Sequence, residues 1–178
     1  ADQGLVFRDS DLYKWLEAAS WALGDEENAA LRKQVEEIVD LIAHAQQDDG
    51  YLNTYFIDER RDERWSNLRD LHELYCAGHL FQAAVAHYRA TSTQRLLNVA
   101  RRFADLICET FGPGEDQRQG VPGHPEIEMG LVELARATGD RRYLDQAAYF
   151  LDARGRGLIG GSGYHQDHAP FRELSALT

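Results

Sequence analysis

The chain has 178 residues, 43% hydrophobic and 28% charged, which is enough for one domain with a buried core. Its formal net charge of −11 opposes binding to a nucleic-acid backbone or to an anionic membrane. The sequence shows no signal peptide and no apolar run of membrane-spanning length. Two cysteines, Cys76 and Cys108, form no disulfide framework, so we expect a reducing, cytoplasmic location.

Apolar residues at helical spacing predict two helices in the first 47 residues. The polar residues 9–11 offer N-caps to the first helix, which Gly24 and Asp25 end. The second spans about 26–47 and carries an apolar stripe opposite charged residues, as half-exposed helices do. The connection 48–64 is polar and aromatic. Loops of this length in compact domains more often carry a function than serve only as linkers.

The stretch from Trp65 to Thr91 is predicted to be a helix buried on most sides, because its apolar residues lie all round it. A buried helix must pair, neutralise or use its titratable groups, and satisfied core polar groups are the plain alternative. The groups concerned are His72, Glu73, Cys76, His79 and His87. A metal on the face shared by His72, Cys76 and His79 is disfavoured, and Cys76, His79 and His87 are interpreted as core packing. Glu73 beside His72 is either an acid–base unit or a group that orients His72 or pairs with an arginine.

Three further helices alternate with two long connections in the rest of the chain. Outer helices are predicted around 95–107 and 143–151, and a helix that begins at Pro125 lies between them. Glu126 and Glu128 fall in its first turn, where the helix dipole favours acidic residues. The long connections are 111–123 and 153–170, another helix begins near Phe171, and no strand pattern is present.

An internal repeat indicates how these helices are arranged. The pattern that begins at Arg89 and continues to Asp105 recurs 47 residues later, from Arg136 to Asp152. Repeats of this length are helical hairpins that bury a face by stacking on their neighbours. HEAT-like and armadillo-like solenoids and helical toroids share this period. An (α/α)6 toroid of six such hairpins needs roughly 280 residues, so this chain supplies about three and a half.

The connections favour the toroid with a pocket. Tight turns follow each inner helix, whereas long connections lead to the next inner helix, so all long connections share one end with the inner-helix N-termini. An enzyme with a pocket at one end needs this asymmetry, and a solenoid scaffold does not. The polar residues expected at this mouth are His72, Glu73, His124, Tyr164, His165, Asp167 and His168. The pattern predicts an all-α fold with a histidine-rich mouth suited to a sugar, and it identifies no catalytic group.

Four segments in order, DDGYLNTYF, HELYCAGHLFQAAVAHYRAT, PGHPEIEMGLVELARATGDRRYLDQAAYFLDARG and YHQDHAPFRE, resemble glycoside hydrolase family 127, the β-L-arabinofuranosidases. The resemblance implies an (α/α)6 barrel, followed in the family by β-sandwich domains. It also implies retaining release of β-linked L-arabinofuranose by a cysteine nucleophile bound to zinc. On this resemblance His72 and His124 contact the sugar, residues 164–168 line the pocket, and Tyr51 lies at its rim.

The resemblance also implies what this chain does not contain. The family's acid/base glutamate, Glu-Thr-Cys zinc ligands and paired cysteines are expected downstream of Thr178, and neither cysteine here matches them. We therefore expect residues 1–178 to be the first half of the barrel, with no metal site of its own and inactive alone. Self-association through the exposed half-barrel edges is expected. The alternatives are a helical-repeat scaffold for glycan or protein, and another toroidal sugar enzyme, an epimerase or lyase.

Overall fold

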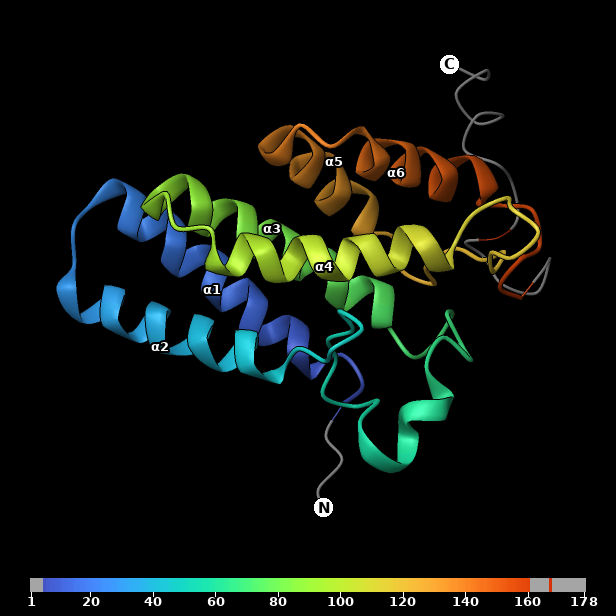
Figure 1. Ribbon diagram of the computed structural model, residues 1–178, viewed down its shortest axis with the longest axis horizontal. Helices are drawn as coiled ribbons and strands as arrows, with labels where there is room; N and C mark the ends of the chain where they lie inside the picture. Colours follow the sequence, from blue (N-terminus) through green and yellow to red (C-terminus); the bar gives the residue numbers. More distant parts are fainter. Residues whose placement is uncertain (1–4, 161–166, 168–178) are drawn as a thin grey trace.

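The computed structural model describes residues 5–160 and residue 167 as an all-α assembly (Figure 1). Within these residues there is no β-strand, and Phe111 and Arg118 form an isolated bridge. The all-α prediction is confirmed. No helix in the described ranges has the length and apolarity needed to cross a membrane. The helices are α1 (Arg8–Asp25), α2 (Ala29–Ala45), the 3-10 helix η1 (Asp58–Glu63), α3 (Glu73–Thr91), α4 (Arg95–Thr110), α5 (Ile127–Thr138) and α6 (Arg141–Ala153).

The helices form three consecutive hairpins with an inner and an outer layer. Helix α3 packs against α1 on one side and α5 on the other, while α4 covers it between α2 and α6 (Figure 1). Most of α3 is buried, whereas α2 buries only Val35, Val39 and Ile42. This is the neighbour order of a toroid, so the predicted partial (α/α) toroid is confirmed. The extra helix expected near Phe171 lies outside the described residues.

Two glycines set the distance between α3 and α5. A Cβ on Gly78 would lie 2.7 Å from the backbone N and Cα of Ile127, and a Cβ on Gly130 would lie 2.7 Å from the carbonyl oxygen of Gly78. Helices approach this closely only where no side chain stands between them. The start of α5 is therefore held directly against the second turn of α3.

The long connections all lie at one end of the array, as predicted. Residues 46–72, 111–126 and 154–160 lie toward the right in Figure 1, next to the first turns of α3 and α5. Tight turns, 26–28, 92–94 and 139–140, close the hairpins at the other end. Long loops at both ends would have favoured a binding scaffold, and the described part of the chain does not have that layout.

The segment from Trp65 to His72 is not helical, which corrects the predicted helix from Trp65. Trp65 and His72 have φ angles of 61° and 57°, in the left-handed region that non-glycine residues seldom adopt. The Glu73 carboxylate accepts a hydrogen bond from the Trp65 N–H at 2.8 Å and fixes the turn. Helix α3 begins only at Glu73.

Two other helix starts also differ from the prediction. Helix α1 is preceded by Phe7 rather than capped by residues 9–11, because Ser10 donates to the Phe7 carbonyl and Asp9 accepts from Thr54. Helix α5 begins at Ile127 rather than at Pro125, so only Glu128 lies in its first turn.

Candidate functional site

Aromatic rings gather where the inner helices begin. We call Phe7, His72, Tyr75, His79 and His124 the ring cluster. Tyr75 is its centre: its ring centroid lies 5.7 Å from that of His72, 5.0 Å from that of His124 and 4.6 Å from that of His79. Phe7 lies 5.7 Å from His72. The cluster draws on the segments before α1 and α5 and on the first turns of α3, so it exists only in the folded chain.

The structure brings together the two histidines that the sequence assigned to one mouth. Their rings stack at 29° with centroids 6.4 Å apart. The Nδ1 atom of His72 lies 2.6 Å from the Asp70 carbonyl oxygen, which can only accept a hydrogen bond. The neutral His72 ring therefore carries its proton on Nδ1 and presents Nε2 as an acceptor. His124 is exposed.

Lys14 adds a positive charge from α1 to the cluster. Its ammonium donates to the Tyr75 hydroxyl at 2.9 Å and to the Ser10 hydroxyl at 3.2 Å, and it lies 3.8 Å from the Asp11 carboxylate. Flat rings beside polar groups are what a neutral sugar requires, because a sugar has both apolar faces and hydroxyls. Sequence reasoning missed Lys14 and Tyr75, although Tyr75 follows His72 by three residues, on the same face of the helix that the sequence predicts.

Within the ring cluster, His79 lies one helical turn after Tyr75 and contacts Glu126. His79 Nδ1 lies 3.3 Å from Glu126 Oε1, and their side chains are only 12% and 11% exposed. Burial, together with the nearby charges of Lys14 and His124, lowers the pKa of His79 to about 4. Burial, Glu17 and Glu128 raise the pKa of Glu126. The sequence placed His79 in core packing, whereas the structure places it against Tyr75 and a carboxyl group.

Tyr51 and Glu73, expected at the sugar, lie in the core behind the ring cluster. Tyr51 is fully buried and Glu73 is 1% exposed. The Tyr51 hydroxyl donates to Glu73 Oε1 at 2.5 Å, while Glu73 Oε2 accepts the Trp65 N–H. Burial raises the pKa of Glu73 to about 7. Both carboxylate oxygens are engaged in holding the turn that ends at His72, so these residues support the site without facing it.

Asp167 also has an internal role in the structure. Its buried carboxylate accepts hydrogen bonds from the N–H groups of Gly155 and Gly157 at 3.1 Å and of Ile159 at 3.2 Å. It therefore shapes the connection after α6 rather than presenting its oxygens to a sugar. His165 and His168, the other candidates of this loop, lie outside the described residues, as does Tyr164.

The described residues do not fit a zinc site. Nowhere in residues 5–160 and 167 do three His, Cys, Asp or Glu side chains converge as metal ligands. Cys76 is buried and Cys108 half-buried, and burial raises the pKa of each thiol to about 12. Both are protonated at neutral pH, whereas a zinc ligand or a nucleophile must be a thiolate. The interpretation of Cys76 as core packing agrees with its position.

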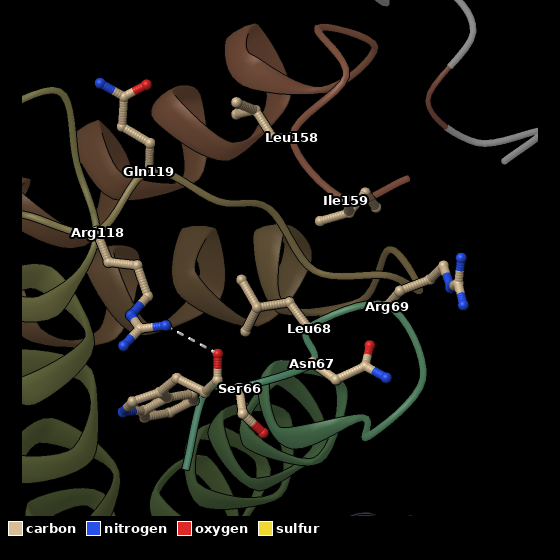
Figure 2. A pocket seen from close by; sticks show the side chains of 9 residues that line it. Ser66, Asn67, Leu68, Arg69, Arg118, Gln119, Leu158 and Ile159 are labelled. Atoms are coloured by element: carbon tan, nitrogen blue, oxygen red, sulfur yellow. Dashed lines mark hydrogen bonds between the residues drawn. The ribbon is translucent and has the colours of Figure 1, made fainter. Parts of the chain in front are cut away.

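A cavity of about 300 Å³ opens at the same end of the array (Figure 2). Figure 2 shows the Arg118 side chain reaching the Trp65 carbonyl, a hydrogen bond of 3.1 Å, with Leu68 beside it. The Gly123 N–H donates to the Leu68 carbonyl at 2.9 Å, which ties this wall to the segment that carries His124. The lining residues are Trp65, Ser66, Asn67, Leu68, Arg69, Arg118, Gln119, Leu158 and Ile159.

Residues 2–177 match the family model described as the β-L-arabinofuranosidase GH127 catalytic domain. The chain belongs to glycoside hydrolase family 127. The resemblance drawn from the four sequence segments is thereby confirmed over nearly the whole chain.

Individual relatives agree in sequence and in shape. A non-reducing end β-L-arabinofuranosidase of Bifidobacterium longum subsp. longum is 44% identical over 157 residues, covering 86% of this chain and 24% of that protein. A crystal structure of a GH127 β-L-arabinofuranosidase from Geobacillus stearothermophilus T6 superposes with a TM-score of 0.89 at 45% identity, over 96% of this chain and 30% of that one. A further GH127 β-arabinofuranosidase gives 0.87 at 39%, over 96% and 28%. The chain thus spans about a quarter of its curated relative.

Proposed function

We propose that this chain forms one wall of the sugar pocket of a glycoside hydrolase that releases β-linked L-arabinofuranose from glycans. The observation that carries the proposal is the meeting of His72, Tyr75 and His124 at the inner-helix N-termini of a family 127 domain. The names of the relatives, each a β-arabinofuranosidase, support the sugar and the linkage.

The described residues would act by binding and orienting. The faces of Tyr75 and of the two histidines offer apolar contact to a furanose ring, and Nε2 of His72 offers an acceptor for a sugar hydroxyl. The Lys14 ammonium, already bonded to the Tyr75 hydroxyl, offers a donor on the α1 side. Two imidazoles and an ammonium around the Tyr75 ring fix the orientation of the bound sugar, which an aromatic ring alone would not do.

We propose that bond cleavage depends on groups from outside residues 1–178. In the described part, both thiols are protonated and Glu73 has both oxygens engaged inside the core. The acid/base glutamate, the cysteine nucleophile and its zinc, all implied by the family resemblance, belong to the rest of the catalytic domain. The zinc would supply the charge that keeps a cysteine ionised as a nucleophile, and no role of the present residues depends on it.

Binding and turnover test this proposal separately. We expect L-arabinose to shift the ring resonances of His72 and His124 in NMR spectra of the 178-residue chain. His72→Ala should weaken L-arabinose binding by about tenfold, because the lost hydrogen bond and ring contact together amount to about 1.4 kcal/mol of binding free energy. His44→Ala, on the exposed side of α2, is the matched control. On an aryl β-L-arabinofuranoside the chain alone should show no turnover, and robust turnover would overturn the assignment of catalysis elsewhere.

We also propose that the chain self-associates through the edges of the helix array. Exposed apolar side chains lie on α1, where Trp15 and Trp21 are 40% and 48% exposed, and on α6, where Leu144 is 45% exposed. Large apolar residues grouped on an edge favour burial against another copy. Sedimentation velocity over a concentration series tests this: Trp15→Lys should shift the chain toward monomer, and a wild type that is monomeric at every concentration refutes it.

A further inference from the structure

The contact between His79 and Glu126 exists because of the helix crossing beneath it. Gly78, next to His79, lies against Ile127, next to Glu126, with a backbone approach that leaves no room for a Cβ. This approach places a histidine and a glutamate of two different inner segments 3.3 Å apart in a nearly closed space. Both ring nitrogens of His79 and the Oε1 atom of Glu126 are buried without a hydrogen-bond partner among the described residues, although the contact brings Nδ1 and Oε1 to 3.3 Å. Glu126 is thus the polar group within reach of this ring.

The pair supports the part of the ring cluster that faces the sugar in the proposed function. The His79 ring meets the Tyr75 ring edge-on, at 85° and 4.6 Å, and Tyr75 in turn contacts His124 at 5.0 Å. Glu126 follows His124 by two residues, and its backbone N–H donates to Glu128 Oε2 at 3.0 Å. A displacement of His79 or Glu126 would therefore move the ring of Tyr75 and the segment that carries His124 together.

We propose that His79 and Glu126 are positioning residues, whose contact joins α3 to the start of α5 and fixes Tyr75 and His124 against the sugar. This rests on the proposed function only for the identity of the ligand. Neither residue touches the sugar in this proposal; both act through the rings above them.

The charges around the pair decide its protonation. On the α1 side lie Lys14, Asp11 and Glu17, and on the other sides lie His124 and Glu128. His79 stays neutral until the pH falls to about 4, because burial and the two cationic neighbours oppose a charge. Glu126 holds its proton to higher pH than usual, because burial and two carboxylates oppose ionisation.

We therefore expect the ring nitrogen of His79 that carries the proton to change as the pH rises. While Glu126 is protonated, a hydrogen bond across this contact requires its hydroxyl to donate to His79 Nδ1, which leaves the ring's own proton on Nε2. Once Glu126 ionises, its carboxylate can only accept a hydrogen bond, which favours the other tautomer of His79, with the proton on Nδ1. A histidine that only fills space in the core has no reason to change tautomer in step with a glutamate.

The test uses the 178-residue chain with ¹⁵N-labelled histidine, and the two ring-nitrogen shifts of His79 report its charge and tautomer. We expect the wild-type ring to stay neutral at pH 5 and to change tautomer as Glu126 ionises. In Glu126→Gln the tautomer should stay constant, and the Tyr75 and His124 resonances should move. Glu109→Gln, an exposed glutamate on α4, should leave all three unchanged.

L-Arabinose affinity supplies the second readout. Glu126→Gln and His79→Gln should each weaken L-arabinose binding about fivefold, the size expected from one lost polar contact, and the double variant should bind no more weakly than either single one. Circular dichroism confirms that each variant is folded. A His79 that titrates near its usual value, or a Glu126→Gln chain with unmoved Tyr75 and His124 resonances, overturns the proposal. If the ring shifts behave as expected but no variant or wild type binds L-arabinose, the proposed function fails while the positioning role stands.

Discussion

Substitution of Gly78 by alanine tests whether the α3–α5 crossing depends on the absence of a side chain. The new Cβ would lie 2.7 Å from the N and Cα atoms of Ile127 and 2.9 Å from the carbonyl carbon of Glu126, all backbone atoms that no rotamer change can move. Overpacking of this kind costs about 1–3 kcal/mol. Alanine is favoured over glycine within a helix by about 1 kcal/mol, which offsets part of the cost. We expect a net loss of about 1–2 kcal/mol, near the upper end because the obstacle is rigid.

Gly24→Ala is the matched control, because Gly24 is also helical but a Cβ there would lie 3.5 Å from that of Ala90, an ordinary contact. This variant should gain about 1 kcal/mol from helix propensity alone. Urea unfolding followed by circular dichroism measures both, and the melting temperature of Gly78→Ala should fall by about 3–8 °C. If Gly78→Ala were as stable as Gly24→Ala, the crossing could not be held by glycine contact, and our account of how Glu126 reaches His79 would fail.

Three further predictions concern stability and local order. Because burial raises the pKa of Glu73 from 4.5 to about 7, the folded chain holds a proton that the unfolded chain loses. Its contribution, about 3 kcal/mol, is complete below pH 4.5 and is lost as the pH rises through 7. Urea titrations from pH 4.5 to 8 should show this loss in wild type and not in Glu73→Gln; equal slopes would contradict it. Asn28→Ala removes the side-chain oxygen that accepts the Leu31 N–H and should lower stability by about 1 kcal/mol, and an unchanged melting temperature would exclude a capping role. Asp167→Ala should speed amide exchange at Gly155, Gly157 and Ile159 about tenfold, since three N–H groups lose their acceptor, and unaltered protection would show that other contacts hold the loop.

The periodicity of the sequence predicts much of the fold because each outer helix has one solvent-exposed and one buried face, which produces a regular apolar stripe. The 47-residue repeat and the alternation of tight turns with long connections also predict the layered toroid and its one-sided mouth. The segment 65–72 was missed for a physical reason: Leu68 and Leu71 continue the helical spacing of α3. What ends the helix is the tertiary contact of Glu73 with Tyr51 and Trp65, which no local pattern contains.

The site residues also divide into those that the sequence predicts and those that depend on tertiary packing. His72 and His124 could be predicted because each lies at the start of an inner helix, and chain topology alone brings such starts together. Tyr75 could also be predicted from the sequence, because it follows His72 by three residues on the same face of the predicted helix. Lys14 and Glu126 were not, since their places depend on how closely α1 and α5 approach α3, and that distance is set by side-chain volumes at the crossings.

The separation of tight turns from long connections gives the domain two independent ends. Residues 26–28 and 92–94 lie at the end opposite the ring cluster, so insertions or bulky labels there leave the ring cluster untouched. Selection acting on ligand choice would alter segments 46–72 and 111–126, while selection acting on heat tolerance could shorten or stiffen the tight turns. Ligand binding and thermal stability can therefore be changed by separate sets of substitutions in the same chain.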